Sequence, residues 1–526
     1  MNLESISLEE TGCFSPLFND YINGREELKP HYGSAPNIES FKILIEERNF
    51  PQKSRKILQE VLYQQYKGID KADKVKENLD LMIKDNTYTI TTGHQLNLFT
   101  GPLYFIYKIV TIINACKSIK EKYPDSNFVP VYWMASEDHD LEEISHFNLF
   151  GKKHQWETDQ TGAVGHMNPK SIANQFSDLP DRGRFFIDAY ADGKTLAGAV
   201  QSYVNTLFGD KGLIVIDADD RALKHKFSEV ILDDIFSNTA NQLVEKAAAD
   251  LNIHGYKTPV FPREINFFYL DKGIRGRIIS EGSVYRVKKT ELVFTGEELK
   301  KLIHESPEKF SPNVILRPLY QETILPDLAY IGGPAEIAYW LQLKEVFGHY
   351  KTPFPILMPR NFALIIPKRV MRKIEKTGLR LAQLFLPLNK LKKQFVSDNT
   401  DKEIHLDHEI SHVKAVFETI KEKAIEVDKS LGGLVGAEQA RTLKSLGNIG
   451  KRIKKSEEQN QQIGIQQIES IKGKLFPNGH LQERYDNFLN FYVNDENFLQ
   501  ELIDKFDPFS YSFHIFKEEE VRESAT

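Results

Sequence analysis

Three consecutive stretches decide the fold: TYTITTG at residues 87–93, LYFIYKIVTIINACKSIKEK at residues 103–122, and FVPVYWMAS at residues 128–136. The first and third are short and rich in β-branched and aromatic residues, which is typical of buried strands. The middle stretch is long and largely apolar, and Gly101 and Pro102 precede it, so it predicts a helix. Strand, helix and strand in this order predict a βαβ unit and a doubly wound parallel sheet.

The α/β pattern continues on both sides of this unit, to about residue 368. The first 85 residues have helical spacing and few helix breakers, so we expect them to be largely helical. GLIVIDADD, residues 212–220, predicts another buried strand. Residues 151–205 are polar and show little strand signal, which predicts an irregular insertion over the sheet. Further elements are expected as one helix over 222–251 and as strands over 259–270, 284–294 and 313–316.

The composition changes after residue 368, where Lys, Glu, Gln, Ile and Leu dominate and aromatics become scarce. Apolar residues there recur at alternating intervals of four and three positions, which is the spacing of the residues along the seam of a coiled coil. Glycines in LGGLVGAEQ, residues 431–439, suggest a chain reversal before a second helix from about residue 438, hence an antiparallel hairpin. Aromatics return after Pro477, and the last ten residues are expected to be disordered. The seam residues are Leu406, Ile410, Val413, Phe417, Ile420 and Ala424.

These shifts suggest six segments along the chain. They are an N-terminal helical part (1–85), the first βαβ unit (86–150), a connecting insertion (151–205), the remaining α/β core with a second insertion (206–368), a helical coiled-coil domain (369–475) and a C-terminal segment that packs back on the core (476–526).

Composition excludes several classes of protein. The 526 residues carry 68 Lys and Arg against 74 Asp and Glu, and this mildly acidic balance argues against a nucleic-acid binder. Only Cys13 and Cys116 are present, which excludes a disulfide framework and fits a reducing compartment. We find no signal peptide and no apolar run long enough to cross a membrane, so we expect a cytoplasmic protein.

The first candidate site is TTGHQLNLFTGPLY, residues 91–104, which joins a strand to a helix. Ligands of open α/β sheets bind at this edge, and a helix N-terminus attracts phosphate or carboxylate groups. The loop contributes the candidate binding residues Thr92, Gly93, Gln95 and Gly101 and the candidate catalytic residue His94. A capped turn without function is the alternative.

The second candidate is SEDHDLEEISH, residues 136–146, which follows the next strand and should lie at the same edge. Its titratable groups suit acid–base work or amine recognition, whereas the alternative is an acidic helix N-terminus. The spacing favours no structural metal, because no second set of ligands accompanies the cluster. The candidate catalytic residues are Glu137, Asp138, His139 and Asp140.

The third candidate is IGGPAEIAYWLQLK, residues 331–344, where glycines and a proline again open a helix. The alternative here is an acidic helix start beside a core tryptophan. Just upstream, Arg317 is suited to a carboxylate or phosphate. The candidate binding residues of this region are Arg317, Gln321, Gly332, Gly333, Glu336, Tyr339 and Trp340. The chain lacks the Walker A, GxGxxG, GxSxG and HExxH motifs.

Three of these stretches occur in an order that resembles the bacillithiol biosynthesis cysteine-adding enzyme family: residues 91–104, VPVYWMASEDHDLEEISH at 129–146, and RPLYQETILPDLAYIGGPAEIAYW at 317–340. The resemblance implies a Rossmann-like core with inserted connecting segments and a coiled-coil domain that forms homodimers. It also implies a ligase that joins the carboxylate of cysteine to the amine of glucosaminyl malate, the last step of bacillithiol synthesis, and it associates nucleotide binding with the fold.

Amide formation from a carboxylate requires activation, so ATP is expected as the activating nucleotide, with ADP as a possible product and Mg as its companion. On this hypothesis His94 and Gln95 contact phosphate or the transition state, the cluster from Glu137 to Asp140 takes the proton of the amine with His139 as the favoured base, and Arg317 meets a malate carboxylate. Glu336, Tyr339 and Trp340 would form a second wall. Two alternatives stay open: a nucleotidyltransferase or pantothenate-synthetase-like ligase with another substrate, and a non-catalytic coiled-coil scaffold.

Overall fold

The computed structural model describes residues 1–400 and 406–518. The disorder that the sequence predicts for the tail falls mainly on residues 519–526, which lie outside the described residues. Lys517, at the start of that tail, is instead the last residue of strand β15 (Ser512–Lys517).

The described residues form two compact units. The first contains residues 3–364 together with residues 482–516, and the second contains residues 365–481. The sheet, the candidate residues and the aromatic-rich C-terminal stretch therefore belong to one unit, because residues 482–516 return to it.

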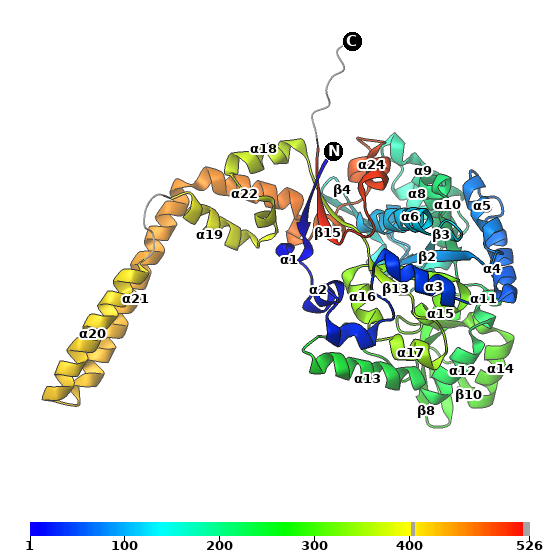
Figure 1. Cartoon of the computed structure of the whole chain (residues 1–526), viewed down its shortest axis with the longest axis horizontal. Helices are drawn as coiled ribbons and strands as arrows, with labels where there is room; N and C mark the ends of the chain where they lie inside the picture. The colour runs from blue at the N-terminus through cyan, green and yellow to red at the C-terminus, as the bar shows by residue number, and fades with distance from the viewer. Residues whose placement is uncertain (401–405, 519–526) are drawn as a thin grey trace, which may run out of the picture. The chain divides into compact units, whose positions relative to one another are not determined.

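A five-stranded parallel sheet forms the centre of the first unit, which confirms the predicted fold class (Figure 1). Strand β2 is fully buried along its length, as expected for a parallel sheet. It pairs with β3 from Thr87 opposite Asn127 to His94 opposite Met134. The strands run in the order β13 (Ile356–Pro359), β12 (Asp327–Gly332), β2 (Thr87–His94), β3 (Asn127–Met134) and β6 (Ile214–Asp217).

Helix α6 (Tyr104–Lys122) connects β2 to β3 and packs against both, so the predicted βαβ unit is present. Twelve of its nineteen residues are buried, because the helix lies against the sheet and beneath other segments. The loop before it is clamped by Asn487, whose side-chain amide donates hydrogen bonds to the carbonyls of Phe99 at 2.8 Å and Gly101 at 2.7 Å. The loop is therefore fixed by a residue almost four hundred positions away in the chain.

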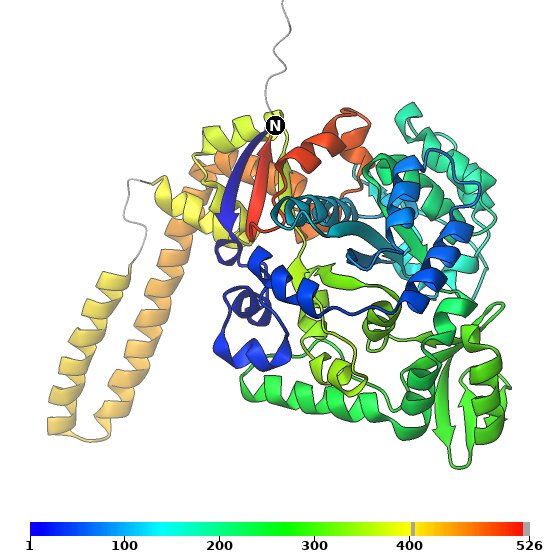
Figure 2. The ribbon, with the colours of Figure 1, turned by 45° about the vertical axis from the view of Figure 1, so that its right-hand side comes forward.

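A second sheet is antiparallel, with helices α12 (Ser228–Ser237) and α14 (Gly296–Glu305) packed against its strands (Figure 2). The predicted strand over 259–270 begins only at Phe267, since the prolines in 259–262 lack the N–H groups that a ladder needs. The strand order is β10 (Val293–Thr295), β9 (Val284–Val287), β8 (Ile274–Glu281), β7 (Phe267–Asp271) and β11 (Phe310–Pro312).

The strand predicted over residues 313–316 is wrong. Asn313 instead makes a turn, in which its side chain accepts hydrogen bonds from the N–H groups of Ile315 at 2.8 Å and Leu316 at 3.4 Å. The backbone carbonyl of Asn313 then accepts from Arg317, and helix α15 (Arg317–Ile324) begins there. An Asn that bonds its own downstream backbone favours a turn over a strand.

Three further predictions are corrected by the structure. The helix expected over 222–251 is three helices, α11 (Arg221–His225), α12 and α13 (Thr239–Ile253), and Asn238 at φ +54° breaks the chain between the last two. The insertion expected to be irregular folds around Phe99, which its aromatic side chains surround, and it contains helices α8, α9 and α10. The N-terminal part is mostly helical, but Asn2–Ser7 forms strand β1 beside β15. The insertion helices span Lys170–Gln175, Arg184–Asp192 and Leu196–Phe208.

The second unit is helical and contains the predicted antiparallel hairpin (Figures 1 and 2). Its arms, α20 (Asp407–Val427) and α21 (Leu431–Asn460), lie side by side. The reversal occurs at residues 428–430 and not in the glycine-rich stretch, which lies inside α21. Gly432 there allows the arms to approach, since a Cβ atom would lie 3.0 Å from Ile425. Helices α18 (Lys368–Thr377), α19 (Leu388–Asp398) and α22 (Gln462–Leu475) complete the unit.

Candidate functional site

A cavity of about 620 Å³ opens at the carboxyl ends of β2, β3 and β12 in the first unit. This is the edge at which open α/β sheets bind ligands. The cavity brings together nine residues that the sequence singled out and others that it did not. The nine are Gly93, His94, Gln95, Glu137, Asp138, Arg317, Gly333, Glu336 and Tyr339, and the others include Tyr104, Lys108, Trp133, Ser136, Glu143, Arg275, Asn313, Tyr330, Arg360 and Arg484.

One wall of the cavity carries a buried ion pair between α6 and α16 (Pro334–Trp340). The ammonium of Lys108 lies 2.5 Å from Glu336 and also donates to the carbonyl of Gly93 at 2.8 Å. Burial would raise the pKa of Glu336, but Lys108 and hydrogen bonds from Tyr330 and Gly333 outweigh it and hold the pKa at about 2. Burial lowers the pKa of Lys108, and the nearby carboxylate opposes that change. The pair therefore stays charged and internally balanced.

His94 lies beside this pair and is neutral. Burial, and then the charge of Lys108, lower the pKa of its imidazole to about 3. Its Nδ1 lies 3.1 Å from the carbonyl oxygen of Gln95, so Nδ1 carries the proton and donates it there. Its Nε2 is buried and has no hydrogen-bond partner among the described residues. At a cavity wall, that nitrogen can accept a hydrogen bond from a ligand.

The acidic stretch after β3 is divided between two environments. Asp138 accepts from the side-chain amide of Gln95 at 2.9 Å, and the same amide donates to Glu143 at 2.7 Å. Burial acts against ionisation of Asp138, but hydrogen bonds from His139 and Gln95 and the charge of Arg275 lower its pKa well below the usual range. Asp138 is therefore a fixed negative charge at the cavity.

His139 and Asp140 do not line the cavity. The Nδ1 atom of His139 accepts a hydrogen bond from Arg275 at 2.7 Å, and nearly half of its side chain is exposed. Asp140 caps the short helix α7 (Leu141–Ile144) by accepting from the N–H of Glu143 at 3.1 Å. The arrangement gives Asp140 the structural role that the sequence left as the alternative.

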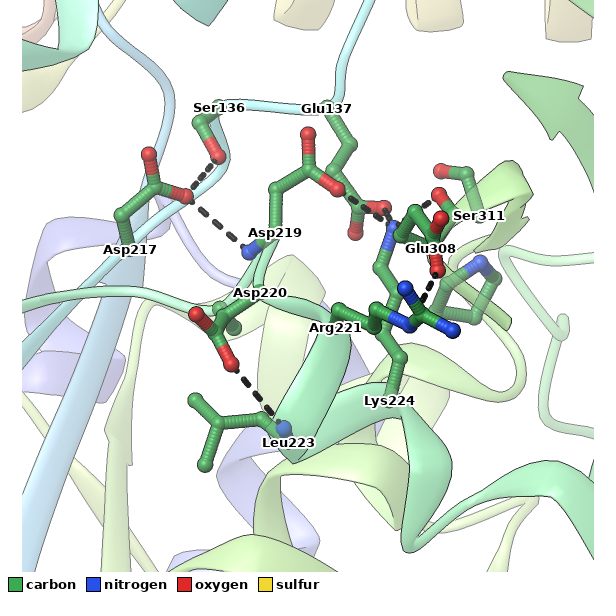
Figure 3. Close-up of polar contacts among 12 residues, drawn as sticks. Ser136, Glu137, Asp217, Asp219, Asp220, Arg221, Leu223, Lys224, Glu308 and Ser311 are labelled. Carbon is green, nitrogen blue, oxygen red and sulfur yellow. Dashed lines mark hydrogen bonds and ion pairs between the residues drawn. The ribbon is translucent and has the colours of Figure 1, made fainter. Parts of the chain in front are cut away.

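Glu137 faces the cavity and is held by a lysine from another element. The ammonium of Lys224, on α11, contacts Glu137 and lies 2.6 Å from Asp219 (Figure 3). Burial raises the pKa of Glu137, although Lys224 opposes the change. Burial would lower the pKa of Lys224, but the two carboxylates outweigh it and raise that pKa. One cation thus serves two carboxylates, which leaves this cluster with a net negative charge.

Arg317 stands on the wall formed by α15. Its guanidinium lies over the rings of Trp133 at 5.7 Å and Tyr330 at 5.5 Å, and Nη1 donates to Gln321 at 3.0 Å. Its Nη2 is buried and makes no hydrogen bond among the described residues. An oriented guanidinium with a spare N–H is suited to an anionic ligand.

Several predicted binding residues support the site from behind and do not line it. Thr92 donates to the carbonyl of Ile331 at 2.7 Å, and Trp340 stacks on Tyr330 with ring centres 4.5 Å apart. Gly101 is required by its own turn, because it has φ +63° and a Cβ atom would lie 2.5 Å from the Asn97 side chain. Gln321 and Gly332 are likewise buried beneath the cavity wall.

One N–H group at each helix start that the sequence favoured for anion binding is already engaged. The N–H of Leu103, before α6, donates to the carbonyl of Asp486 at 2.9 Å. The N–H of Gly333, before α16, donates to Glu336 at 2.7 Å. The positive charge at the cavity comes instead from side chains, which include Arg484 from the returning C-terminal stretch, over the ring of Tyr104 at 5.7 Å.

Sequence reasoning could have found one of the missed residues. Lys108 interrupts the apolar first half of the helix, four positions after Tyr104, and a lysine on a buried helix face requires a partner. Arg275 and Arg484 carry no such local signal, because they reach the cavity from the second sheet and from the C-terminal stretch, and neither does Lys224, which contacts Glu137 from α11.

Other kinds of site receive no support from the arrangement of side chains. Within residues 1–400 and 406–518, no group of three or more His, Cys, Asp or Glu side chains is placed to hold a metal ion. Across the same residues, no helix is long and apolar enough to span a membrane. Cys13 is exposed, Cys116 is buried, and no disulfide joins them.

Comparison with known proteins places these features in a family. The model of the bacillithiol biosynthesis BshC N-terminal Rossmann-like domain matches residues 1–361, and that of the BshC C-terminal coiled-coil domain matches residues 363–518. The chain is 42% identical to "Putative cysteine ligase BshC" of Cytophaga hutchinsonii, over 98% of both proteins. It is also 42% identical to the protein of that name from Flavobacterium psychrophilum, over 98% of this chain and 100% of the relative. The chain belongs to the bacillithiol biosynthesis BshC family.

Proposed function

We propose that this protein is a carbon–nitrogen ligase that joins the carboxyl group of cysteine to the amine of glucosaminyl malate, the last step of bacillithiol biosynthesis. The names of its relatives support a cysteine ligase. The observation that carries the proposal is the cavity itself, where a buried carboxylate of raised pKa, Glu137, and a guanidinium with a spare N–H, Arg317, face the same space. An amine and an anionic substrate require these two kinds of group.

The base in this proposal is Glu137 and no longer His139. A carboxylate whose pKa is raised by burial accepts a proton more readily than an ordinary one, and Glu137 lines the cavity. His139 does not line it, and its Nδ1 is occupied by Arg275. Neutral His94 would accept a hydrogen bond from the amine or thiol of a substrate through Nε2, which revises the phosphate contact expected from the sequence.

Arg317 would bind a carboxylate of the malate group, with Tyr339 beside it. Its cation–π contacts with Trp133 and Tyr330 hold the guanidinium plane in place before the substrate arrives. Glu336 would act with Lys108 as a charged wall, close to the second wall that the sequence suggested. Orientation of both reactants before reaction lowers the barrier to amide formation.

ATP is the proposed activating nucleotide, because a carboxylate does not acylate an amine in water unless it is first activated. Arg484 and Arg275 are the cavity cations that could meet its phosphates. An accompanying Mg²⁺ would bind Asp138 and Glu143, two carboxylates that accept hydrogen bonds from the same Gln95 amide.

Mass spectrometry of product formation tests this proposal. Purified protein is incubated with cysteine, glucosaminyl malate and Mg-ATP, with parallel tubes that lack nucleotide or contain Glu137→Gln. Bacillithiol that forms only with ATP and is lost in the variant supports both the ligase and the base, and AMP against ADP identifies the activation step. Product without ATP would contradict nucleotide activation, and no product in any tube would contradict the ligase.

A homodimer through the coiled coil is a second part of the proposal. Apolar side chains remain exposed on α20 and α21, among them Val416 at 58%, Ile420 at 45% and Leu434 at 60%. Exposed apolar groups on a paired hairpin are typical of an interface with another chain. Light scattering should give the mass of two chains for the wild type and of one for V416E/I420E, with E422K as a charge-change control. A monomeric wild type would contradict the dimer.

Location in the cytoplasm completes the proposal. A reducing compartment suits a chain in which Cys13 and Cys116 are not joined. Fractionation of producing cells should place the protein with cytoplasmic markers, and recovery with the periplasm or membrane would contradict this.

A further inference from the structure

A second cavity lies beside the candidate site, and a chain of charged groups connects the two. This cavity also has a volume of about 620 Å³ and lies between the insertion and the second sheet. His166 and Asp219 line it, whereas Glu137 lines the first cavity. Lys224 lies between them, contacting Glu137 on one side and Asp219 at 2.6 Å on the other (Figure 3). Asp219 in turn lies 2.7 Å from the Nε2 atom of His166.

This chain of groups is buried except at its end in the second cavity. The side chains of Glu137, Lys224 and Asp219 are 13%, 2% and 8% exposed, whereas that of His166 is 51% exposed. Lys224 also donates to the carbonyl of Glu308 at 3.0 Å, which fixes the ammonium between its two carboxylates. The chain thus begins at a buried wall of one cavity and ends at solvent in another.

The backbone is built to keep the two ends together. The N–H of Val164 donates to the carbonyl of Asp138 at 2.7 Å, and that of Gly165 donates to the carbonyl of Ser136 at 2.8 Å. A Cβ atom on Gly165 would lie 2.6 Å from Ser136, so only glycine permits this approach without a shift. The insertion is therefore locked to the loop that carries Glu137, and it presents His166 to Asp219.

We propose that Glu137, Lys224, Asp219 and His166 form a proton exit path from the first cavity to solvent in the second. The inference rests on the proposed ligase function. Amide formation from an ammonium group and an activated carboxyl releases protons from the nitrogen. Glu137 takes one proton, and Lys224 then passes a proton to Asp219 while it regains one from Glu137, so the ammonium is restored. Asp219 transfers the proton to neutral His166, which releases it to water.

The surroundings of His166 favour its place as the last acceptor of the path. Asp217 and Asp219 both act on His166, and the hydrogen bond to Asp219 is the main reason that the pKa of His166 is raised above its usual value. Arg275 acts on Glu137 from the second sheet, and Arg221 lies 3.8 Å from Glu308 behind Lys224. His166, Asp219 and Glu308 share the second cavity with the charged residues Asp159, Asp271, Lys272 and Lys309.

Turnover of His166→Gln in weak buffer tests the path. Glutamine can still donate to Asp219 but cannot carry a proton, so we expect kcat to fall about tenfold or more with KM unchanged, and imidazole in the buffer to restore it. The control is His349→Gln, whose histidine is 43% exposed, lies 3.6 Å from Asp233 and lines neither cavity. It should behave as the wild type.

The outcomes separate the path from the ligase function. No product with wild-type protein would overturn the ligase. Product from the wild type and equal kcat in His166→Gln would overturn the path alone, as would a loss that imidazole does not restore. NMR titration tests the pair of Asp219 and His166 without any turnover. Asp219→Asn should lower the pKa of His166, and an unchanged pKa would also overturn the path.

Discussion

Two buried lysines at the candidate site have opposite charge balances. Lys108 meets one carboxylate, Glu336, and burial leaves its pKa lowered, whereas Lys224 meets two carboxylates and its pKa is raised. The first cluster is neutral overall and the second carries a net negative charge. A balanced pair holds a wall in place, while a cluster with a surplus carboxylate has a group that can take up a proton. The number of carboxylate partners, and not burial alone, therefore distinguishes the structural Lys108 from Lys224, which takes part in the proposed chemistry.

Removal of Lys224 is expected to have the largest effect. Lys224→Met leaves Glu137 and Asp219 buried without a cation, which should lower the free energy of unfolding by about 3–5 kcal/mol. Urea denaturation measures the change. Lys246→Met is the control, because its pair with Glu345 is exposed at 70% and 44% and should contribute under about 1 kcal/mol. Equal effects of the two variants would contradict the comparison.

Removal of Lys108 should cost less, about 2–3 kcal/mol, because only one carboxylate loses its cation. Glu336 keeps hydrogen bonds from Tyr330 and Gly333, and its side chain is 26% exposed to the cavity. Glu336→Gln in the same chain should recover part of the loss, since no charge then remains unpaired. Urea denaturation of the two single variants and the double variant gives the coupling free energy between Lys108 and Glu336. Losses of stability that simply add would contradict an interaction between the two side chains.

The two histidines beside these lysines should respond to pH with opposite signs. The pKa of His94 is lowered to about 3, so the unfolded chain binds its proton first, and stability falls as pH drops below 6.5. Between pH 6.5 and 5 this loss is about 2 kcal/mol, and His94→Asn should remove it. The pKa of His166 is raised, so its contribution is present below 6.5 and is lost as pH rises through its folded pKa. Urea denaturation across pH 5–8 compares each variant with the wild type. A pH dependence of the unfolding midpoint that shifts in the same direction in His94→Asn and His166→Gln would contradict this.

Local patterns in the sequence predict the parallel sheet and much of one wall of the site. β2, α6 and β3 follow from β-branched runs and an apolar helix, and parallel strands must end at one edge, which is why the sequence alone brings His94 and Glu137 together. The same patterns fail at Asn313 and Asn238, where one side chain or one left-handed residue ends an element. A single residue outweighs the propensity of its neighbours at such points.

The rest of the site depends on contacts between segments far apart in the chain. Arg275 and His166 reach the cavities from the second sheet and the insertion, and Lys224 reaches Glu137 from α11. Nothing within their own stretches indicates a partner. The predicted acid cluster is likewise split by tertiary packing, because Glu137 turns to Lys224 while His139 turns to Arg275. Composition shows that charges are present, but only packing decides which are buried.

The smallest effect is expected at Asp140, and it sharpens the division of that cluster. Asp140 accepts from the N–H of Glu143 as the cap of a four-residue helix, so Asp140→Ala should lower stability by about 1 kcal/mol, and Asp140→Ser should restore most of it. Turnover should be unchanged in both variants, because the side chain does not line the cavity. A loss of turnover in Asp140→Ala that serine does not restore would place Asp140 with Glu137 in the chemistry. Unchanged turnover instead removes Asp140 from the chemistry and leaves Glu137 as the proposed base. Glu137 shares Lys224 with Asp219, and this sharing distinguishes the Lys224 cluster from the Lys108 pair.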